Sequence, residues 1–301
     1  HKVHANKKAM GTTQLSGKTV SYQGDPLPQT ISGYWERGLV RIFTPNSYME
    51  NVHLVGGIID SARTSGVAIG GLAARVQSYG TITQCSVTDL SIQTPDQAAS
   101  LSAGGLVGTA DSNITFTDCY AADLTLNAVT SKNNAFSADG FGGILGYGSS
   151  NITFDNCYTS GTLNSEVMNT GGLAGVVQGT SSVSNCYSAM NISLGSSNGA
   201  GLIGKNMGEL ELSHCLYTGS FGVASKSDTV HLILGYNSSS VTMDQVYIYQ
   251  PHLEEDSSLK DEGAELVSYE QLTTGDAYTG GTNSIFSGDS HYAESWSFGG
   301  E

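Results

Sequence analysis

The chain has 301 residues, of which 13% are charged and 39% are hydrophobic, and its formal net charge is −15. This negative charge argues against binding to nucleic acid or insertion into anionic membranes, because both partners attract basic surfaces. The apolar content is too high for a disordered chain. No segment predicts a membrane span, and no signal peptide is visible.

Residues 1–32 show no repeat and predict an N-terminal cap. The stretch from Thr13 to Gly33 is expected to lay edge strands over the first coil of the repeat array in residues 33–250. Such a cover is needed because the open end of a repeat array exposes unpaired backbone and apolar core.

Residues 33–250 contain a repeat in which an aliphatic residue of a Gly-rich run is followed by a cysteine thirteen positions later. The pairs are Leu72 and Cys85, Leu106 and Cys119, Ile144 and Cys157, Leu173 and Cys186, and Leu202 and Cys215. The same offset joins Leu39 to Val52 and Ile233 to Val246. All five cysteines occupy this slot, so seven tandem units share one internal spacing and predict a repeat architecture.

Each unit contains the pattern of three short strands. The third residue before the cysteine slot is apolar in every unit, namely Met49, Ile82, Phe116, Phe154, Val183, Leu212 and Met243. A second strand covers the Gly-rich run, and a third follows the cysteine with alternating apolar residues such as Leu124 and Leu126. We therefore predict an all-β fold, a single-stranded parallel β-helix of about seven coils capped at both ends. Equivalent residues should stack in ladders about 4.8 Å apart.

Residues 251–301 predict an acidic linker followed by a C-terminal cap. The segment ELVSYEQLTTGDAY predicts a short helix with Ser268 or a neighbour as its cap. Trp296 and Phe298 are candidates to cover the last coil. Two longer turns, Thr94–Ala103 and Asn127–Phe141, interrupt the repeat and are the first places to look for a partner.

The units GGLVGTADSNITFTDCYA from Gly104 and GGILGYGSSNITFDNCYT from Gly142 resemble the GLUG-motif repeats of bacterial cell-surface proteins. Such repeats also occur ahead of the peptidase domain in some immunoglobulin A1 metallopeptidases. The resemblance covers about residues 37–250. The outer copies depart from the pattern, because Arg41 and Ala74 replace the closing glycine and valine replaces the cysteine.

The odd number of cysteines favours a buried column of free thiols. Zinc would need ligands that converge at short spacings, and parallel side chains in register give poor disulfide geometry. No metal or cofactor is predicted. Gly199, Gly201 and Gly204 match a dinucleotide-binding pattern, but the following ELELSHC predicts a strand where phosphate binding needs a helix.

The side chains that could face a ligand are Tyr120, Tyr158, Tyr187, Tyr247, Asp89 and Asp123. The tyrosines follow the cysteine slot and predict a stacked column, which could also serve as a sugar platform. The two aspartates each lie four residues after a cysteine, and a carboxylate pair is the minimum for glycoside cleavage. The residue before the slot is polar in all seven units and predicts a ladder that satisfies turn backbone: Asn51, Gln84, Asp118, Asn156, Asn185, His214 and Gln245. Asn113 and Asn151 share one repeat position, which favours a turn role over glycosylation.

The preferred function is a non-catalytic extracellular or cell-surface module, which the resemblance implies, for adhesion or for presenting loops to a host or matrix partner. That partner would be a protein or a glycan. One alternative is a β-helix that binds or cleaves carbohydrate, and a second is a structural spacer in a longer surface protein. Neither a catalytic motif nor a nucleic-acid or membrane partner is predicted.

Overall fold

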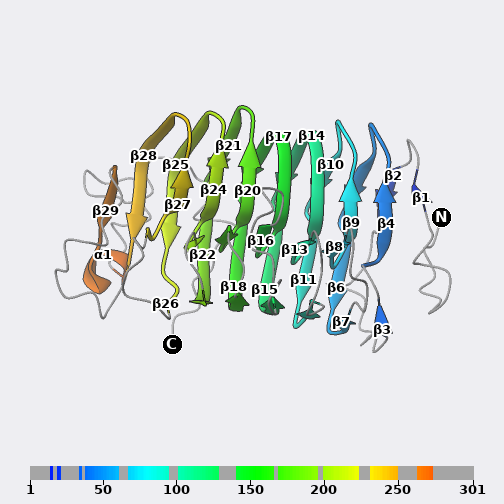
Figure 1. Cartoon of the computed structure of the whole chain (residues 1–301), viewed down its shortest axis with the longest axis horizontal. Coiled ribbons are helices and arrows are strands. Elements are labelled where there is room, and N and C mark those ends of the chain that lie inside the picture. The colour runs from blue at the N-terminus through cyan, green and yellow to red at the C-terminus, as the bar shows by residue number, and fades with distance from the viewer. Residues whose placement is uncertain are drawn as a thin grey trace.

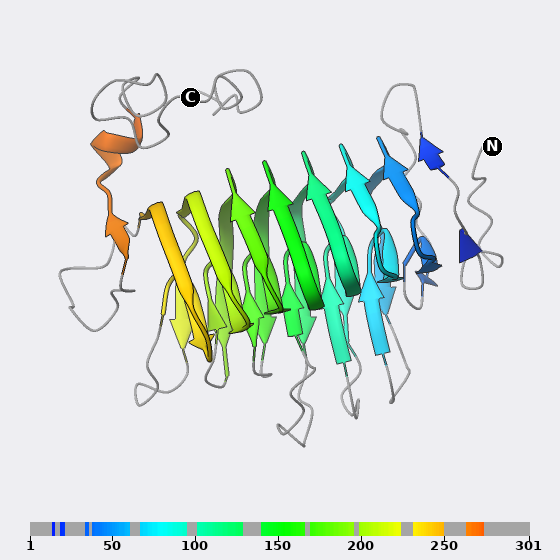
Figure 2. The same cartoon turned by 90° about the horizontal axis from the view of Figure 1, so that it is seen from above.

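The computed structural model describes residues 14–15, 19–21, 34–35, 38–60, 67–94, 101–128, 140–165, 169–195, 199–223, 231–249 and 263–273. Within these residues the fold is a parallel β-solenoid, and α1 (Tyr269–Thr273) is the one helix. Figure 1 shows the strands lying across the long axis, side by side from the N-terminal to the C-terminal end. Figure 2, turned by 90°, shows the same succession of turns from above. The predicted fold class is confirmed.

Three walls make up the large sheet, and every pairing between turns is parallel. The first wall contains β4 (Val40–Phe43), β9 (Ala73–Val76), the starts of β14 (Val107–Thr117) and β17 (Leu145–Asp155), β20 (Ala174–Gln178), β24 (Ile203–Met207) and β27 (Leu234–Asn237). The second contains β5 (Tyr48–Glu50), β10 (Thr81–Thr83), the ends of β14 and β17, β21 (Ser181–Ser184), and the starts of β25 (Leu210–Tyr217) and β28 (Val241–Ile248). The third contains β6 (His53–Val55), β7 (Ile58–Asp60), β11 (Ser86–Thr88), β12 (Ser91–Gln93), β15 (Tyr120–Ala128), β18 (Tyr158–Ser165), β22 (Tyr187–Leu194), β26 (Phe221–Val223) and the ends of β25 and β28.

A second, small sheet lies on the remaining side and contains β8 (Val67–Gly70), β13 (Leu101–Gly104), β16 (Gly140–Gly142), β19 (Thr170–Gly171) and β23 (Gly199–Ala200). Only these five turns contribute to both sheets in the described part of the chain. The expected number of about seven coils was therefore too high. About five turns are complete, and the first and last repeat copies add partial turns.

The core consists of side chains stacked in register between turns. Ile82 pairs with Phe116, and Phe116 with Phe154, along the second wall, and all three side chains are fully buried. The rings of Phe116 and Phe154 lie parallel, with centroids 5.1 Å apart. The predicted alternation of buried and outward residues is confirmed along these strands.

All five cysteines are free and completely buried, which confirms the predicted thiol column. Each thiol lies near the carbonyl oxygen two residues before it, at 3.0–3.3 Å. The backbone bonds run from turn to turn, since the N–H of Tyr158 donates to the carbonyl of Cys119 at 3.1 Å. The valine of the last copy continues the column, because Val246 pairs in register with Cys215.

From the third repeat copy to the last, the closing glycine of the motif lies against the backbone of the preceding turn. We call Gly108, Gly146, Gly175, Gly204 and Gly235 the glycine seam. A Cβ atom on Gly146 would lie 2.7 Å from the amide nitrogen of Ala103 in the small sheet, and one on Gly204 would lie 2.6 Å from that of Thr170. A side chain at these positions would separate the first wall from the small sheet.

Short strands extend the large sheet at both ends of the rod. β1 (Gln14–Leu15) and β2 (Thr19–Ser21) pair with β4 and β5, so edge strands do lie over the first turn. β3 (Tyr34–Trp35) pairs with β7, and β29 (Ala264–Leu266) pairs with β28. Ser268 caps α1 through a reciprocal pair of bonds with Gln271, at 3.2 and 2.7 Å. Trp296, Phe298 and the loop centres 95–100 and 129–139 lie outside the described residues.

Candidate functional site

The turn between the second and third walls is built from the polar residues before the cysteine slot. All seven adopt the left-handed conformation, with φ between 50° and 54°: Asn51, Gln84, Asp118, Asn156, Asn185, His214 and Gln245. The side chains also bond along the rod, since the amide of Asn156 donates to Asp118 and that of Asn185 donates to Asp155 at 3.0 Å. The predicted structural ladder is confirmed. These residues form the corner after which the chain enters the third wall, where the tyrosines lie.

The predicted tyrosine column exists on the outer face of the third wall. Tyr120 stacks on Tyr158 with centroids 4.8 Å apart, and Tyr158 stacks on Tyr187 at 5.5 Å. The ring planes differ by only 9–10°, so both faces of Tyr158 are occupied by its neighbours. The column therefore presents ring edges and phenol groups to its surroundings, and burial raises the pKa of both Tyr158 and Tyr187.

Tyr247 is separated from the other three tyrosines by Leu216. Leu216 is buried in a small cluster with Val267 and Leu272, against which Tyr187 and Tyr247 pack. The C-terminal part of the column is thus covered by β29 and α1. The sequence placed Tyr247 in the same column but gave no sign of this cover.

The two aspartates lie at equivalent places in neighbouring turns, as predicted, but both occupy a left-handed turn position. Their φ angles are 54° for Asp89 and 51° for Asp123, and both residues are exposed. The Asp89 N–H donates to Ala122, and the Asp123 N–H donates to the hydroxyl of Ser160 at 3.2 Å. The register shifts here between β15 and β18, where Gly161 faces Leu124. Asp123 lies at this bulge, and Asp89 holds the equivalent left-handed turn where β11 and β12 pair with β15 without a shift.

Residues 167–193 match the family model described as the GLUG motif. The chain is a GLUG-motif repeat protein. The matched segment includes β19, β20, β21 and β22, and with them the Gly171–Gly172 run, Cys186 and Tyr187. No significant match was found among curated proteins or among solved structures.

Beside the predicted tyrosine row, the third wall of this GLUG-motif repeat protein contains three polar rows that the sequence analysis did not single out. Four rows of outward residues run along the rod over four successive turns. They are Ser86, Tyr120, Tyr158 and Tyr187; Thr88, Ala122, Ser160 and Ala189; Ser91, Thr125, Thr162 and Asn191; and Gln93, Asn127, Asn164 and Ser193. The bulge interrupts the second row between Ala122 and Ser160, and Ser86 is buried against His53. None of these residues is charged, but the exposed Asp89 and Asp123 lie between the second and third rows. The sequence does contain a signal for these rows. In the third apolar pair of a unit, which follows the cysteine, a polar residue stands on either side of each buried residue.

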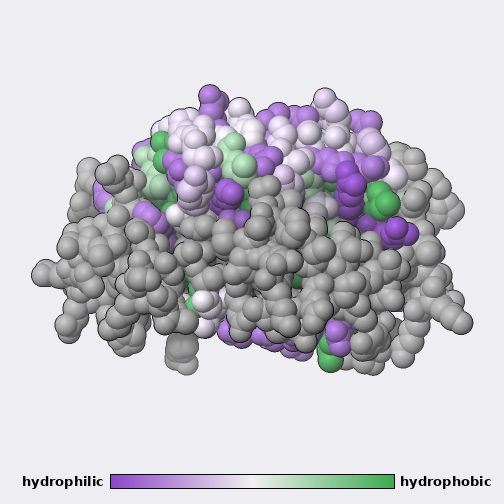
Figure 3. Space-filling view, in the orientation of Figure 1, coloured by the Kyte–Doolittle hydropathy of each residue, from purple (hydrophilic) through white to green (hydrophobic). Residues whose placement is uncertain are grey.

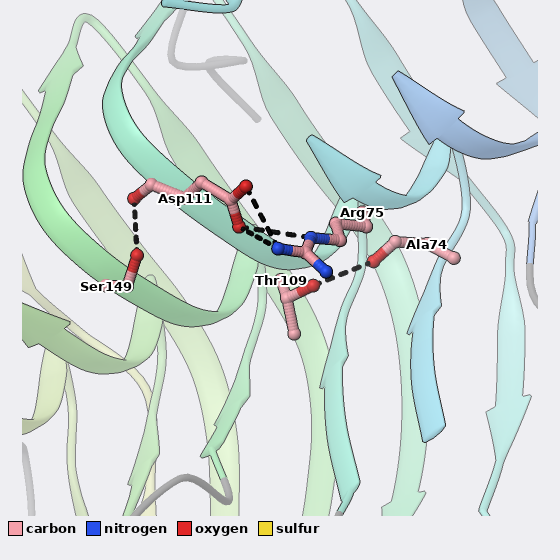
Figure 4. A network of polar contacts seen from close by, with 5 residues as sticks. All are labelled: Ala74, Arg75, Thr109, Asp111 and Ser149. Carbon is pink, nitrogen blue, oxygen red and sulfur yellow. Dashed lines mark hydrogen bonds and ion pairs between the residues drawn. The ribbon is translucent and has the colours of Figure 1, made fainter. Parts of the chain in front are cut away.

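The first wall has a different chemistry. Arg75 forms a bidentate ion pair with Asp111 of the next turn, at 2.8 and 3.0 Å, and the hydroxyl of Ser149 donates to the carbonyl of Asp111 at 2.8 Å (Figure 4). Lys205 lies over the ring of Tyr236, 5.3 Å from its centroid. These side chains lie at the surface, and Figure 3 shows a mostly hydrophilic or neutral exterior where residues are coloured.

The segment that mimics a phosphate-binding loop has no such geometry. Gly199 ends up in β23 and Gly204 in β24, and the next element is strand β25. Asn206 is fully buried and bonds to Asn237 of the next turn at 2.9 Å. The rejection of this motif is confirmed. Among the described residues, no group of three His, Cys, Asp or Glu side chains is placed to hold a metal ion, and no helix has the length and apolarity to span a membrane.

Proposed function

We propose that this GLUG-motif repeat protein is a non-catalytic extracellular module, a rigid rod at a cell surface that presents an adhesive face to a host or matrix partner. The observation that carries the proposal is the in-register stacking of turns from β5 to β28, which fixes outward side chains in straight rows. A surface of repeated identical groups suits an extended or repetitive partner.

The side chains that could take part in catalysis, namely thiols, carboxylates and an imidazole, have structural roles, which supports the non-catalytic part of the proposal. The thiols are buried, and burial raises the pKa of Cys119 and Cys157, so neither is an activated nucleophile. Asp89 and Asp123 form turns. The histidine His53 bridges Asn51 and Ser86 at 2.8 and 2.7 Å, within the corner between walls.

The extracellular part is supported by surface composition. Polar uncharged and acidic side chains dominate the outward positions of the second and third walls. Complete burial protects the thiols in an oxidising environment, since exchange and oxidation need an accessible thiolate.

Beads that display the protein test the proposal by their attachment to an extracellular-matrix preparation. We expect saturable attachment that soluble protein competes away and that heat-unfolded protein does not reproduce. No specific attachment would contradict the adhesive role. Turnover of a polysaccharide that is lost in Asp123→Asn would contradict the non-catalytic role and favour the cleaving alternative.

A further inference from the structure

We infer that the third wall binds a neutral linear polysaccharide whose chain lies along the rod axis. The inference rests on the proposed adhesive function and names the chemistry of its partner. The site is the set of four rows of the third wall, and its tyrosine row runs from Tyr120 to Tyr187 because Ser86 is buried beside His53.

Charge selects the partner. The protein carries a net charge of −15, so an anionic polysaccharide is repelled at long range. A cationic partner would be drawn to acidic side chains such as Glu50, Asp155 and Asp244 on the second wall. The four rows of the third wall contain only hydroxyl, amide, phenol and methyl side chains. Between the second and third rows lie two exposed carboxylates, Asp89 and Asp123, which repel an anionic chain and can accept hydrogen bonds from the hydroxyls of a neutral one.

Periodicity selects a polymer. The third and fourth rows present a hydroxyl or an amide group in every turn, about 4.8 Å apart. Thr125 pairs with Thr162, and Asn127 pairs with Asn164, whose amide donates to the Asn127 oxygen at 2.9 Å. The backbone groups of these strands bond to neighbouring turns, so the side chains are what a ligand would meet. Repeating hydroxyl and amide groups match the repeating hydroxyls of a sugar chain, directly or through bridging water.

The tyrosine row supplies an apolar border to these polar rows. Because the ring faces are stacked on each other, the border consists of ring edges with one phenol group per turn. Sugar C–H groups can pack along such edges while their hydroxyls bond to the threonine and asparagine rows. The cluster of Leu216, Val267 and Leu272 covers the next position of the column and marks the C-terminal limit of the site.

Native gel electrophoresis tests the inference, because this acidic protein migrates freely unless a polysaccharide in the gel retards it. We expect retardation by neutral polysaccharides, with dextran, galactomannan and a mixed-linkage β-glucan as probes, and none by alginate. The double variant Thr162→Ala, Asn164→Ala should bind about tenfold more weakly, which corresponds to about 1.4 kcal/mol.

The matched control is Thr115→Ala, Thr153→Ala, which removes two stacked hydroxyl groups from the second wall. It should retain wild-type retardation. If the test variant does not fold, Ser193→Glu replaces it, because Ser193 is exposed in the same rows and a charge there should also weaken binding.

Three outcomes overturn the inference: equal retardation of test and control variants, retardation by alginate alone, or no retardation by any neutral probe. Attachment to matrix that survives these results would leave the adhesive function standing with another partner. Loss of matrix attachment as well would remove the proposed function itself.

Discussion

The glycine seam and the third wall run along the same rod, yet different forces determine their residues. At the seam two backbones touch, and a Cβ on Gly175 would lie 2.6 Å from the carbonyl carbon of Gly140. On the third wall the side chains stack outside the sheet, and the tyrosine row tolerates Ser86 in one turn and Leu216 in another. The fold therefore requires glycine at the seam. The outward positions of the third wall can vary without disturbing the fold, so their residues can be chosen for binding a partner.

The outer repeat copies show the same difference. Arg41 and Ala74 occupy the seam position in the first two copies, where the described structure has no small-sheet strand in the turn before. Glycine appears from Gly108 onward, once β8 and its successors lie behind it. The departures from the motif thus follow from the local presence or absence of a neighbouring backbone.

Placing one methyl group in the seam should give the largest effect. We expect Gly175→Ala to destabilise the protein by more than about 3 kcal/mol or to prevent folding, because the Cβ meets fixed backbone on Gly140 and Gly146. Urea unfolding followed by circular dichroism measures the change.

The matched control is Ala74→Gly at the same repeat position. This variant removes a methyl group that the fold already accommodates. It should lower the free energy of unfolding by about 1 kcal/mol, because glycine adds backbone entropy to the unfolded chain. A Gly175→Ala variant as stable as this control would show that the seam is not closed by backbone contact.

Alkaline pH should destabilise the protein through its buried thiols. Burial raises the pKa of Cys119, Cys157 and Cys186, and raises the pKa of Cys215 to about 12. In the unfolded chain a thiol has a pKa of about 8.5, so the folded state binds more protons above that pH. Stability should be constant below about pH 8.5 and then fall by about 1.4 kcal/mol per pH unit for each thiol.

Urea unfolding at pH 7.5, 9 and 10 checks this slope. Cys157→Val is the control, since valine already occupies the slot of the last copy in register with Cys215. The Cys157→Val variant should lose stability with pH less steeply, by the contribution of one thiol. Stability that stays constant to pH 10 would contradict the burial of the column.

The sequence predicted the stacking because one fixed offset of thirteen residues can repeat only if each turn returns to the same place. It overestimated the number of coils, because the outer copies keep that offset without a strand in the small sheet. Such strands have little signature, as the three residues of β16 show. The bulge at Asp123 was also missed, since one extra residue between two strands leaves the apolar alternation on either side unchanged.

The stacked tyrosine column was predicted from its repeat position. The structure adds that both faces of Tyr158 are covered by its neighbours, so that ring edges are what the column presents. The neutral rows were missed for another reason. Threonine, serine and asparagine are common at outward strand and turn positions, so Thr125 and Asn127 carry no signal until Thr162 and Asn164 are found beside them.

Truncating a ring on the wall should cost less than filling the seam. We expect Tyr158→Ala to lower stability by about 2 kcal/mol, because two stacked contacts are lost while the strand pairing remains. Tyr79→Ala is the control, since Tyr79 is 62% exposed and should change stability by less than about 0.5 kcal/mol. Equal effects of the two variants would mean that the column adds nothing to the wall.

The smallest effect should come from the corner that joins the walls, and it should be stabilising. Gln84 is exposed and holds a φ of 50°, a conformation that a non-glycine residue adopts at a cost. We expect Gln84→Gly to raise stability by about 0.5–1 kcal/mol, because relief of this strain exceeds the added entropy of the unfolded chain. Asn156→Gly relieves the same strain but removes the bond to Asp118, so its stability should not increase. If both glycines stabilised equally, the polar ladder would contribute nothing beyond turn geometry, and the corner would resemble the seam in depending on backbone alone.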